Sequence, residues 1–197
     1  MLPKQVLALV VSTLMMATAS ASPVGVAPPT HQYLTTDDVP PGLVILNSTT
    51  TSDNGGTLTW YGSQTMSADK DANDCKNSNS GLDPICRRDF AAVRDVCFDL
   101  INDLNQMPGK FDKKVTDVCR TNNGNGGNRC CISWEKGVSS SEYALDSLKP
   151  AAYAVWTNCD FLEGDTWMVS GLTRNTRVGK NNHCTTQCMS NRPNGCA

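Results

Sequence analysis

Histidine and glutamate are scarce in this chain of 197 residues. It contains two histidines, His31 and His183, and three glutamates. A serine or cysteine triad needs a histidine base that a third group holds in place. Neither histidine accompanies a nucleophile motif, because Gly-x-Ser-x-Gly does not occur. The scarcity argues against nucleophilic catalysis, and we assign no catalytic residue.

Neither sign of charge dominates, and repeats are missing. Seventeen Lys+Arg against nineteen Asp+Glu give a formal net charge of −2, which favours neither a specific nucleic-acid partner nor a membrane surface. Repeats and low-complexity tracts, which a structural wall protein would contain, do not occur. The composition therefore fits a globular binding protein or an enzyme better than a structural protein.

Only one long hydrophobic run is present, and it lies at the N-terminus. Residues 6–16 are apolar except for Ser12 and Thr13, Lys4 precedes them and small residues follow at 17–21. A membrane-spanning helix needs about 20 apolar residues, whereas this shorter run with its flanks is typical of a secretory signal. We expect residues 1–21 to be a signal peptide, and the protein to be secreted, extracellular and without a membrane span.

Cysteine, by contrast, is abundant. All ten cysteines follow the signal: Cys75, Cys86, Cys97, Cys119, Cys130, Cys131, Cys159, Cys184, Cys188 and Cys196. An even number in an exported chain predicts disulfides, here five. His183, Cys184 and Cys188 have the spacing of part of a zinc site, but there is no Cys-x-x-Cys pair and no second histidine within reach. We therefore expect no metal and no cofactor.

The mature chain divides by composition into an arm and a core. Residues 22–56 form a Pro/Ser/Thr-rich arm that we expect to be partly disordered, and residues 57–197 form the cysteine-rich core. Two short β-rich runs, 43–46 and 57–61, flank Asn-Gly-Gly and predict a hairpin. Asn47 begins the only N-glycosylation sequon, so we expect it to carry a glycan.

The core begins with a pattern typical of a long helix. Asp83 can cap it and Pro84 suits the first turn. Apolar residues then recur at helical spacing at positions 86, 90, 93, 97, 100, 101 and 104. We expect further elements: an amphipathic stretch at 111–119, strands at 129–134 and 166–170, and a helical region at 139–159 split by Pro150. The predicted fold class is α+β: a small disulfide-stapled domain with a long amphipathic helix packed on a short antiparallel sheet, preceded by an extended arm.

Strand alternation predicts part of the disulfide pattern. Cys130 shares a face with Ile132 and Trp134, so it should point to the core and bond Cys97 or Cys86 on the helix. Those two cysteines would lie about 16 Å apart along a helix, too far to bond each other. Cys131 points the other way and should bond outside this layer, toward the cysteines of the tail.

Three motifs resemble a known family. They are Arg-Cys-Cys-Ile-Ser-Trp at 129–134, Ser-Gly-Leu-Thr-Arg-Asn at 170–175 and the segment from Cys184 to Cys196. They resemble the small secreted fungal proteins of the "WD-like" group, over roughly residues 57–196. More distantly, the chain is similar to fungal necrosis-inducing factors and killer-toxin-like proteins. The resemblance implies secretion, disulfides and an effector role toward a host or competitor, and it brings no catalytic residues.

Binding and hydrolysis both remain open as functions. A binding surface could use the basic tail residues Arg174, Arg177, Lys180 and Arg192. The four tryptophans, Trp60, Trp134, Trp156 and Trp167, are expected in the core, and an exposed one would favour glycan binding. A hydrolase would need two facing carboxylates, from Glu135, Glu142, Asp160, Glu163 or Asp165. We expect a monomeric effector that binds a host protein or a cell-wall component, with a hydrolase or a glycan-binding protein as the alternative.

Overall fold

The computed structural model describes residues 39–51, 55–63, 82–106, 115–122, 128–135, 145–178 and 183–196, all within the unit His31–Ala197. Their elements are β1 (Leu43–Thr50), β2 (Thr57–Ser63), β3 (Pro84–Cys86), β4 (Ala92–Val93), α1 (Arg94–Gln106), β5 (Val115–Thr121), β6 (Arg129–Trp134), the 3-10 helix η2 (Leu145–Leu148), α2 (Lys149–Asn158), β7 (Asp160–Glu163), β8 (Thr166–Val169), β9 (Gly171–Val178) and β10 (His183–Ser190).

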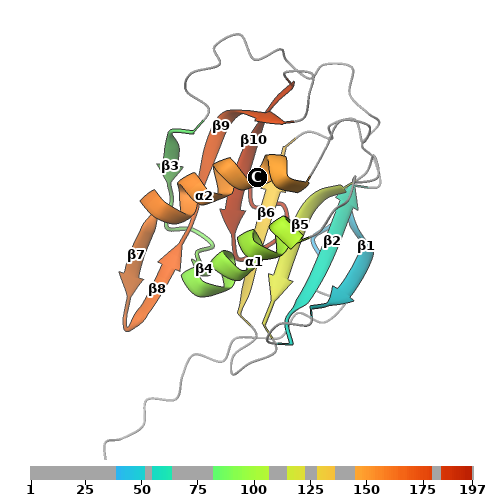
Figure 1. Ribbon diagram of the computed structural model, residues 1–197, viewed down its shortest axis with the longest axis horizontal. Coiled ribbons are helices and arrows are strands. Elements are labelled where there is room, and N and C mark those ends of the chain that lie inside the picture. The colour runs from blue at the N-terminus through green and yellow to red at the C-terminus, as the bar shows by residue number, and fades with distance from the viewer. Residues whose placement is uncertain are drawn as a thin grey trace, which may run out of the picture. The chain divides into compact units, whose positions relative to one another are not determined.

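A large antiparallel sheet is the main feature of these residues (Figure 1). Its strand order is β1-β2-β5-β6-β10-β9-β3, and β4-β8-β7 form a second, smaller sheet. Every neighbouring pair is antiparallel. The predicted α+β fold with a long helix on a short sheet is therefore wrong. The larger sheet has seven strands, and the two α-helices have 13 and 10 residues.

The predicted long helix is divided among three elements. Pro84–Cys86 forms β3 and pairs with β9, and Cys86 is bonded to Cys159. Phe90 has a φ of 53°, a left-handed conformation that an α-helix cannot contain. α1 consequently begins only at Arg94. Pairing with a strand distant in sequence outweighs the helical spacing of the apolar residues here.

The stretch predicted as amphipathic at 111–119 contains a strand instead, with residues 111–114 outside the described part. β5 has four β-branched residues among its seven, which favours a strand. It lies between β2 and β6, and six of its residues are buried. Because both faces are covered, its apolar residues do not alternate with polar ones, and the pattern does not reveal the strand.

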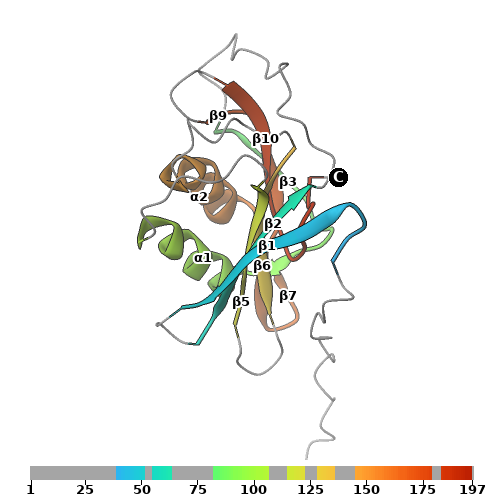
Figure 2. The same ribbon diagram turned by 90° about the vertical axis from the view of Figure 1, so that its right-hand side faces the viewer.

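Both helices cover one face of the large sheet, as the edge-on view in Figure 2 shows. The main core lies between them and the sheet. It includes Leu100, Ile101, Ile132 and Val155, each at most 1% exposed. In the described part of the chain, neither helix is long and apolar enough to cross a membrane.

Other predicted elements are present. β1 and β2 form the predicted hairpin, β6 is the strand expected at 129–134, and β8 lies within the one expected at 166–170. Of the helical region predicted at 139–159, residues 139–144 lie outside the described part. In the rest, η2 precedes α2, and Pro150 lies in the first turn of α2. Proline is tolerated there because the first N–H groups of a helix have no partner within it.

Candidate functional site

Four disulfides connect the described elements, which confirms the disulfide prediction for eight cysteines. They are Cys86–Cys159, Cys97–Cys130, Cys119–Cys131 and Cys188–Cys196. Cys184 is also disulfide-bonded, and Cys75 lies outside the described residues.

One of the two partners predicted for Cys130 is correct, but the partner expected for Cys131 in the tail is wrong. Cys130 bonds Cys97 of α1, as the alternation of β6 predicts. Cys131 does face away from the helices, yet it bonds Cys119 and not a cysteine of the tail. The two are direct cross-strand partners in β5 and β6, with Cα atoms 4.0 Å apart. Since 111–119 was not predicted as a strand, this neighbour could not be foreseen.

Exposed aromatic side chains gather where α1 and α2 lie side by side. The ring of Phe98 stacks on that of Trp156 with centroids 5.0 Å apart, and Tyr153 lies 5.5 Å from Trp156. Phe98 and Tyr153 are 41% and 47% exposed, and Trp156 is half-buried. The indole N–H of Trp156 donates to the carbonyl of Arg94. The rings are thus fixed in place while much of their surface meets solvent.

A second group of exposed apolar residues lies on the hairpin of β7 and β8. Leu162 and Trp167 are cross-strand partners, and they are 56% and 53% exposed. Asp160 lies two residues before Leu162 and Val169 lies two residues after Trp167, and these two residues also pair. Val169 is fully buried in the core beneath the helices, so strand alternation places Leu162 and Trp167 on the same face as the helices.

Arg94 connects the two groups. Its guanidinium lies 3.8 Å from the ring centroid of Trp156, a cation–π contact, and its Nε lies 3.1 Å from a carboxylate oxygen of Asp160. Asp160 in turn shares the hairpin face with Leu162. We call the two groups together, Phe98, Tyr153, Trp156, Leu162 and Trp167, the aromatic surface. Figure 1 shows the elements that carry it: α1, α2 and the β7–β8 hairpin.

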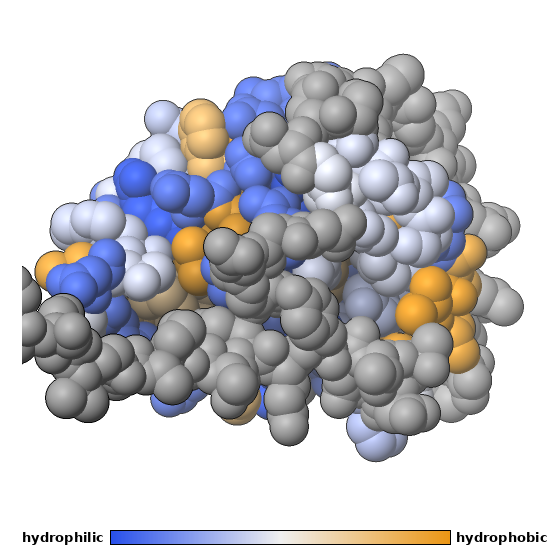
Figure 3. All heavy atoms as spheres, turned by 90° about the horizontal axis from the view of Figure 1, so that it is seen from below, coloured by the Kyte–Doolittle hydropathy of each residue, from blue (hydrophilic) through white to orange (hydrophobic). Residues whose placement is uncertain are grey.

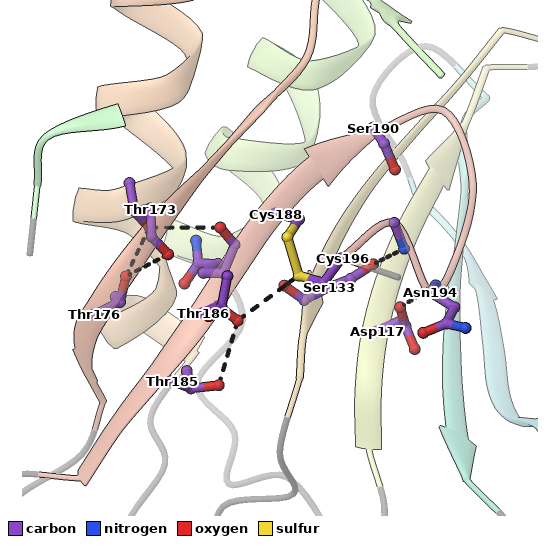
Figure 4. The surroundings of a disulfide bond; sticks show 12 residues. Asp117, Ser133, Thr173, Thr176, Thr185, Thr186, Cys188, Ser190, Asn194 and Cys196 are labelled. Carbon is purple, nitrogen blue, oxygen red and sulfur yellow. Dashed lines mark hydrogen bonds between the residues drawn. A yellow bond between two sulfur atoms is a disulfide. The ribbon is translucent and has the colours of Figure 1, made fainter. Parts of the chain in front are cut away.

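On the opposite face of the large sheet, a buried carboxyl binds the C-terminal segment, residues 191–196 (Figure 4). Asp117 of β5 is 1% exposed. The backbone N–H of Asn194 donates to its Oδ1 at 2.6 Å, and the Thr116 hydroxyl donates to its Oδ2 at 2.6 Å. The Gly195 N–H donates to the Ser133 hydroxyl oxygen. With the Cys188–Cys196 bond, these contacts hold the segment against the sheet.

Burial raises the pKa of Asp117, and hydrogen bonds from Ser133, Thr116 and the Asn194 amide lower it by less. Burial also raises the pKa of the Tyr61 hydroxyl, against the opposing effect of Arg129. Asp117 and Ser133 have no histidine beside them among the described residues. Their contacts run to backbone groups of the C-terminal segment, so this cluster stabilises that segment and has no arrangement suited to nucleophilic catalysis.

A small cavity lies beside the same segment. Its volume is about 80 Å³, and Arg87, Asp89, Phe90 and Cys188 are among its lining residues. Ligand pockets usually measure about 300–1,000 Å³. Asp89 is the one carboxylate that lines it, whereas hydrolysis of a glycoside needs two. The cavity is therefore too small and too poor in acids for a hydrolase site.

The predicted basic surface is only partly described. Arg174 lies on β9 with an exposed side chain. The guanidinium of Arg192 lies 3.2 Å from the ring centroid of Phe90 and is half-buried. The side chain of Arg177 and all of Lys180 lie outside the described part. Arg174 is thus the one exposed cation of this set among the described side chains.

The carboxylates considered for hydrolysis lie in different surroundings. Asp160 pairs with Arg94, while Glu163 and Asp165 are exposed at the turn of the β7–β8 hairpin. Glu135 is exposed after β6, and Glu142 lies outside the described residues. The described side chains include no group of three His, Cys, Asp or Glu that could hold a metal ion.

Sequence reasoning missed most of the aromatic surface. The sequence pattern predicts that Trp156 lies in the core, and it does not mark Phe98, Tyr153 or Leu162 as surface residues. The signal in the sequence was weak: Phe98 follows Cys97 directly and so falls outside the apolar stripe of its helix. The sequence analysis expects the tryptophans in the core and leaves glycan binding open for an exposed one. Trp167 is exposed.

A family model described as "Fungal WD-like" matches residues 36–196. No curated protein and no solved structure matches the chain.

Proposed function

Since the chain belongs to the Fungal WD-like family, we propose that it is a secreted protein of the effector type that binds a protein of a host or a competitor. Secretion is supported by the N-terminal signal pattern and by the four described disulfides, which persist outside the cell. The effector role is an expectation from the sequence motifs at 129–134, 170–175 and 184–196, and experiments with host tissue test it.

The observation that carries the binding proposal is the aromatic surface. Apolar side chains scattered singly over a surface need no explanation, but exposed apolar side chains that cluster mark an interaction site, and here Phe98 stacks on Trp156 and Leu162 pairs with Trp167. Tryptophan, tyrosine and arginine contribute most to binding energy at protein interfaces, and here Tyr153, Trp156 and Arg94 lie in contact. The rings are held by packing before binding, so little conformational entropy is lost on association.

Glycan binding is the second candidate, because Trp167 is 53% exposed. A protein partner is favoured over a polysaccharide because Leu162 lies opposite Trp167. An aliphatic neighbour adds apolar contact area and offers a sugar no hydrogen bond.

The test uses purified, oxidised protein infiltrated into candidate host tissue, together with a gene-deletion strain in virulence and competition assays. Double substitution of Leu162→Ser and Trp167→Ala should abolish the host response. Both side chains are more than half exposed. The free energy of unfolding of the variant should therefore lie within about 0.5 kcal/mol of that of the wild type. The matched control is Ile45→Ala, an exposed apolar residue on β1 at the far edge of the sheet, which should leave the response unchanged.

A photo-crosslinking residue placed at Tyr153 identifies the partner. We expect one protein adduct that disappears in the Leu162→Ser/Trp167→Ala variant. Wild-type protein that sediments with insoluble chitin or β-glucan, and loses this property in the same variant, would instead establish glycan binding. A deletion strain with full virulence and competitiveness, and no response to the wild-type protein, would contradict the effector role.

A further inference from the structure

β1 is an edge strand with an apolar surface. It pairs only with β2 among the described strands, and it ends the order of the large sheet. Ile45 and Leu46 in it are 44% and 40% exposed. Figure 3 shows a hydrophobic patch on the right-hand side, the side on which β1 lies in Figure 1. The unpaired N–H and C=O groups of such an edge can pair with a strand of another molecule.

The N-glycosylation sequon lies within this same strand, directly after the apolar residues. Asn47, Ser48 and Thr49 are all exposed residues of β1. A register shift between Ile45 and Asn47 places Asn47 opposite Trp60. Bulges of this kind are common on edge strands and disturb pairing with further strands.

The side chain of Asn47 is exposed. Its Oδ1 accepts the backbone N–H of Ser48 at 2.8 Å, and no described residue accepts a hydrogen bond from its Nδ2. The Nδ2 atom is the one to which an N-linked glycan is attached. The side-chain carbonyl is thus engaged, while the nitrogen that would be modified has no hydrogen-bond partner among the described residues.

We propose that Asn47 carries an N-linked glycan, and that this glycan covers the outer edge of β1 and prevents its pairing with a second copy of the chain. Residues of a strand follow each other at about 3.3 Å, so Leu46 and Ile45 lie within about 7 Å of the attachment point. A glycan is bulky and hydrated and is much larger than this spacing. The inference rests on the proposed secretion, because N-glycans are added in the secretory pathway.

The test is secretion from a yeast host of the wild type and of two variants without the sequon, Asn47→Gln and Thr49→Ala. Thr50→Ala, the neighbouring exposed threonine outside the sequon, is the matched control. Intact mass before and after glycosidase treatment measures the glycan, and sedimentation velocity over a range of concentrations measures self-association. We expect a glycosylated monomer for the wild type and for Thr50→Ala.

Both variants without the sequon should self-associate at least about tenfold more tightly than the wild type. Adding Ile45→Lys to Asn47→Gln should restore the monomer, because a lysine on the edge opposes strand pairing. Trimming the folded wild-type glycoprotein with an endoglycosidase gives the same comparison if the variants fold poorly.

Two results would overturn the proposal: secreted wild type without a glycan at Asn47, or trimmed and unglycosylated protein that stays monomeric at every concentration. To separate this inference from the proposed secretion, each chain is made with its own N-terminal segment and with a foreign signal. If the protein is glycosylated and monomeric when a foreign signal directs it, but is not secreted with its own N-terminal segment, the inference is supported. Secretion by residues 1–21 is then contradicted.

Discussion

The two faces of the large sheet are closed in different ways. On the face under α1 and α2, the core consists of apolar residues and the Cys97–Cys130 bond. On the other face, the apolar cluster includes Tyr61, Cys119 and Cys131, and the C-terminal segment is held by hydrogen bonds and a second disulfide. The difference indicates that global stability depends on the helical face, whereas the other face depends on local connections that can fail separately.

The largest effect should follow from breaking the disulfide of the helical face. The double substitution of Cys97 and Cys130 by alanine opens a loop of 33 residues, which by chain entropy costs about 4 kcal/mol. Both cysteines are fully buried, so the loss should be global. Urea unfolding followed by tryptophan fluorescence and circular dichroism should give one cooperative transition at a lower midpoint. An unchanged midpoint would contradict the assignment of global stability to this face.

The second effect concerns a cation that is buried beneath the helices. Arg120 is 1% exposed and pairs with Asp103 and Asp99 of α1. Asp103→Ala should destabilise by about 3 kcal/mol, because a buried charge loses a partner and Asp99 compensates only in part. Thermal unfolding measures the loss. Asp95→Ala, an exposed carboxylate on the same helix, is the control and should change little; equal effects of the two would refute the importance of the buried pair.

The third prediction addresses the opposite face. Replacing both Cys188 and Cys196 by alanine opens a loop of only 8 residues, which costs about 2.5 kcal/mol by the same entropy argument. We expect the loss to be local: hydrogen exchange should increase at Asn194 and Gly195, whose amides bond Asp117 and Ser133. Exchange in α1 should stay unchanged. Faster exchange throughout α1 would show that the two faces do not fail separately.

The smallest effect is the pH dependence that arises from Asp117. Because burial raises its pKa above the usual 3.8, the folded protein binds this proton more tightly than the unfolded chain does. The contribution of Asp117 to the free energy of unfolding is therefore present below pH 3.8 and is lost as the pH rises through the raised pKa. Asp117→Asn should remove that decline, so the free energy of unfolding of the wild type, relative to the variant, should fall with increasing pH. A difference that rises with pH would contradict the raised pKa.

Short-range patterns predicted individual strands better than helices. The β1–β2 hairpin followed from two β-rich runs around Asn-Gly-Gly, and the alternation in β6 placed Cys130 toward α1. The helix expected from Asp83 failed because apolar spacing cannot register that 84–86 pairs with β9. Gly56 is a further case: the sequence explains it as a turn residue, but an added Cβ there would lie 2.7 Å from the guanidinium of Arg120.

The candidate site was the least predictable part. An aromatic residue at helical spacing is more often buried than exposed, so Tyr153 and Trp156 gave no sign of a surface. Exposure depends on where each element lies in the sheet and on what covers it. The β7–β8 hairpin belongs to a separate small sheet, and this placement leaves Leu162 and Trp167 open to solvent.

By itself, the sequence determined the disulfide-rich nature of the core, because it contains ten cysteines, an even number, and it determined the alternating faces of β6, because side-chain direction in a strand is local. Only the tertiary structure decided the strand order, the partner of Cys131 and the aromatic surface. Each of these depends on contacts between segments far apart in the chain: Cys119 reaches Cys131 through strand pairing, and Trp156 meets Phe98 only because two helices lie side by side. Local spacing carries no information about such neighbours.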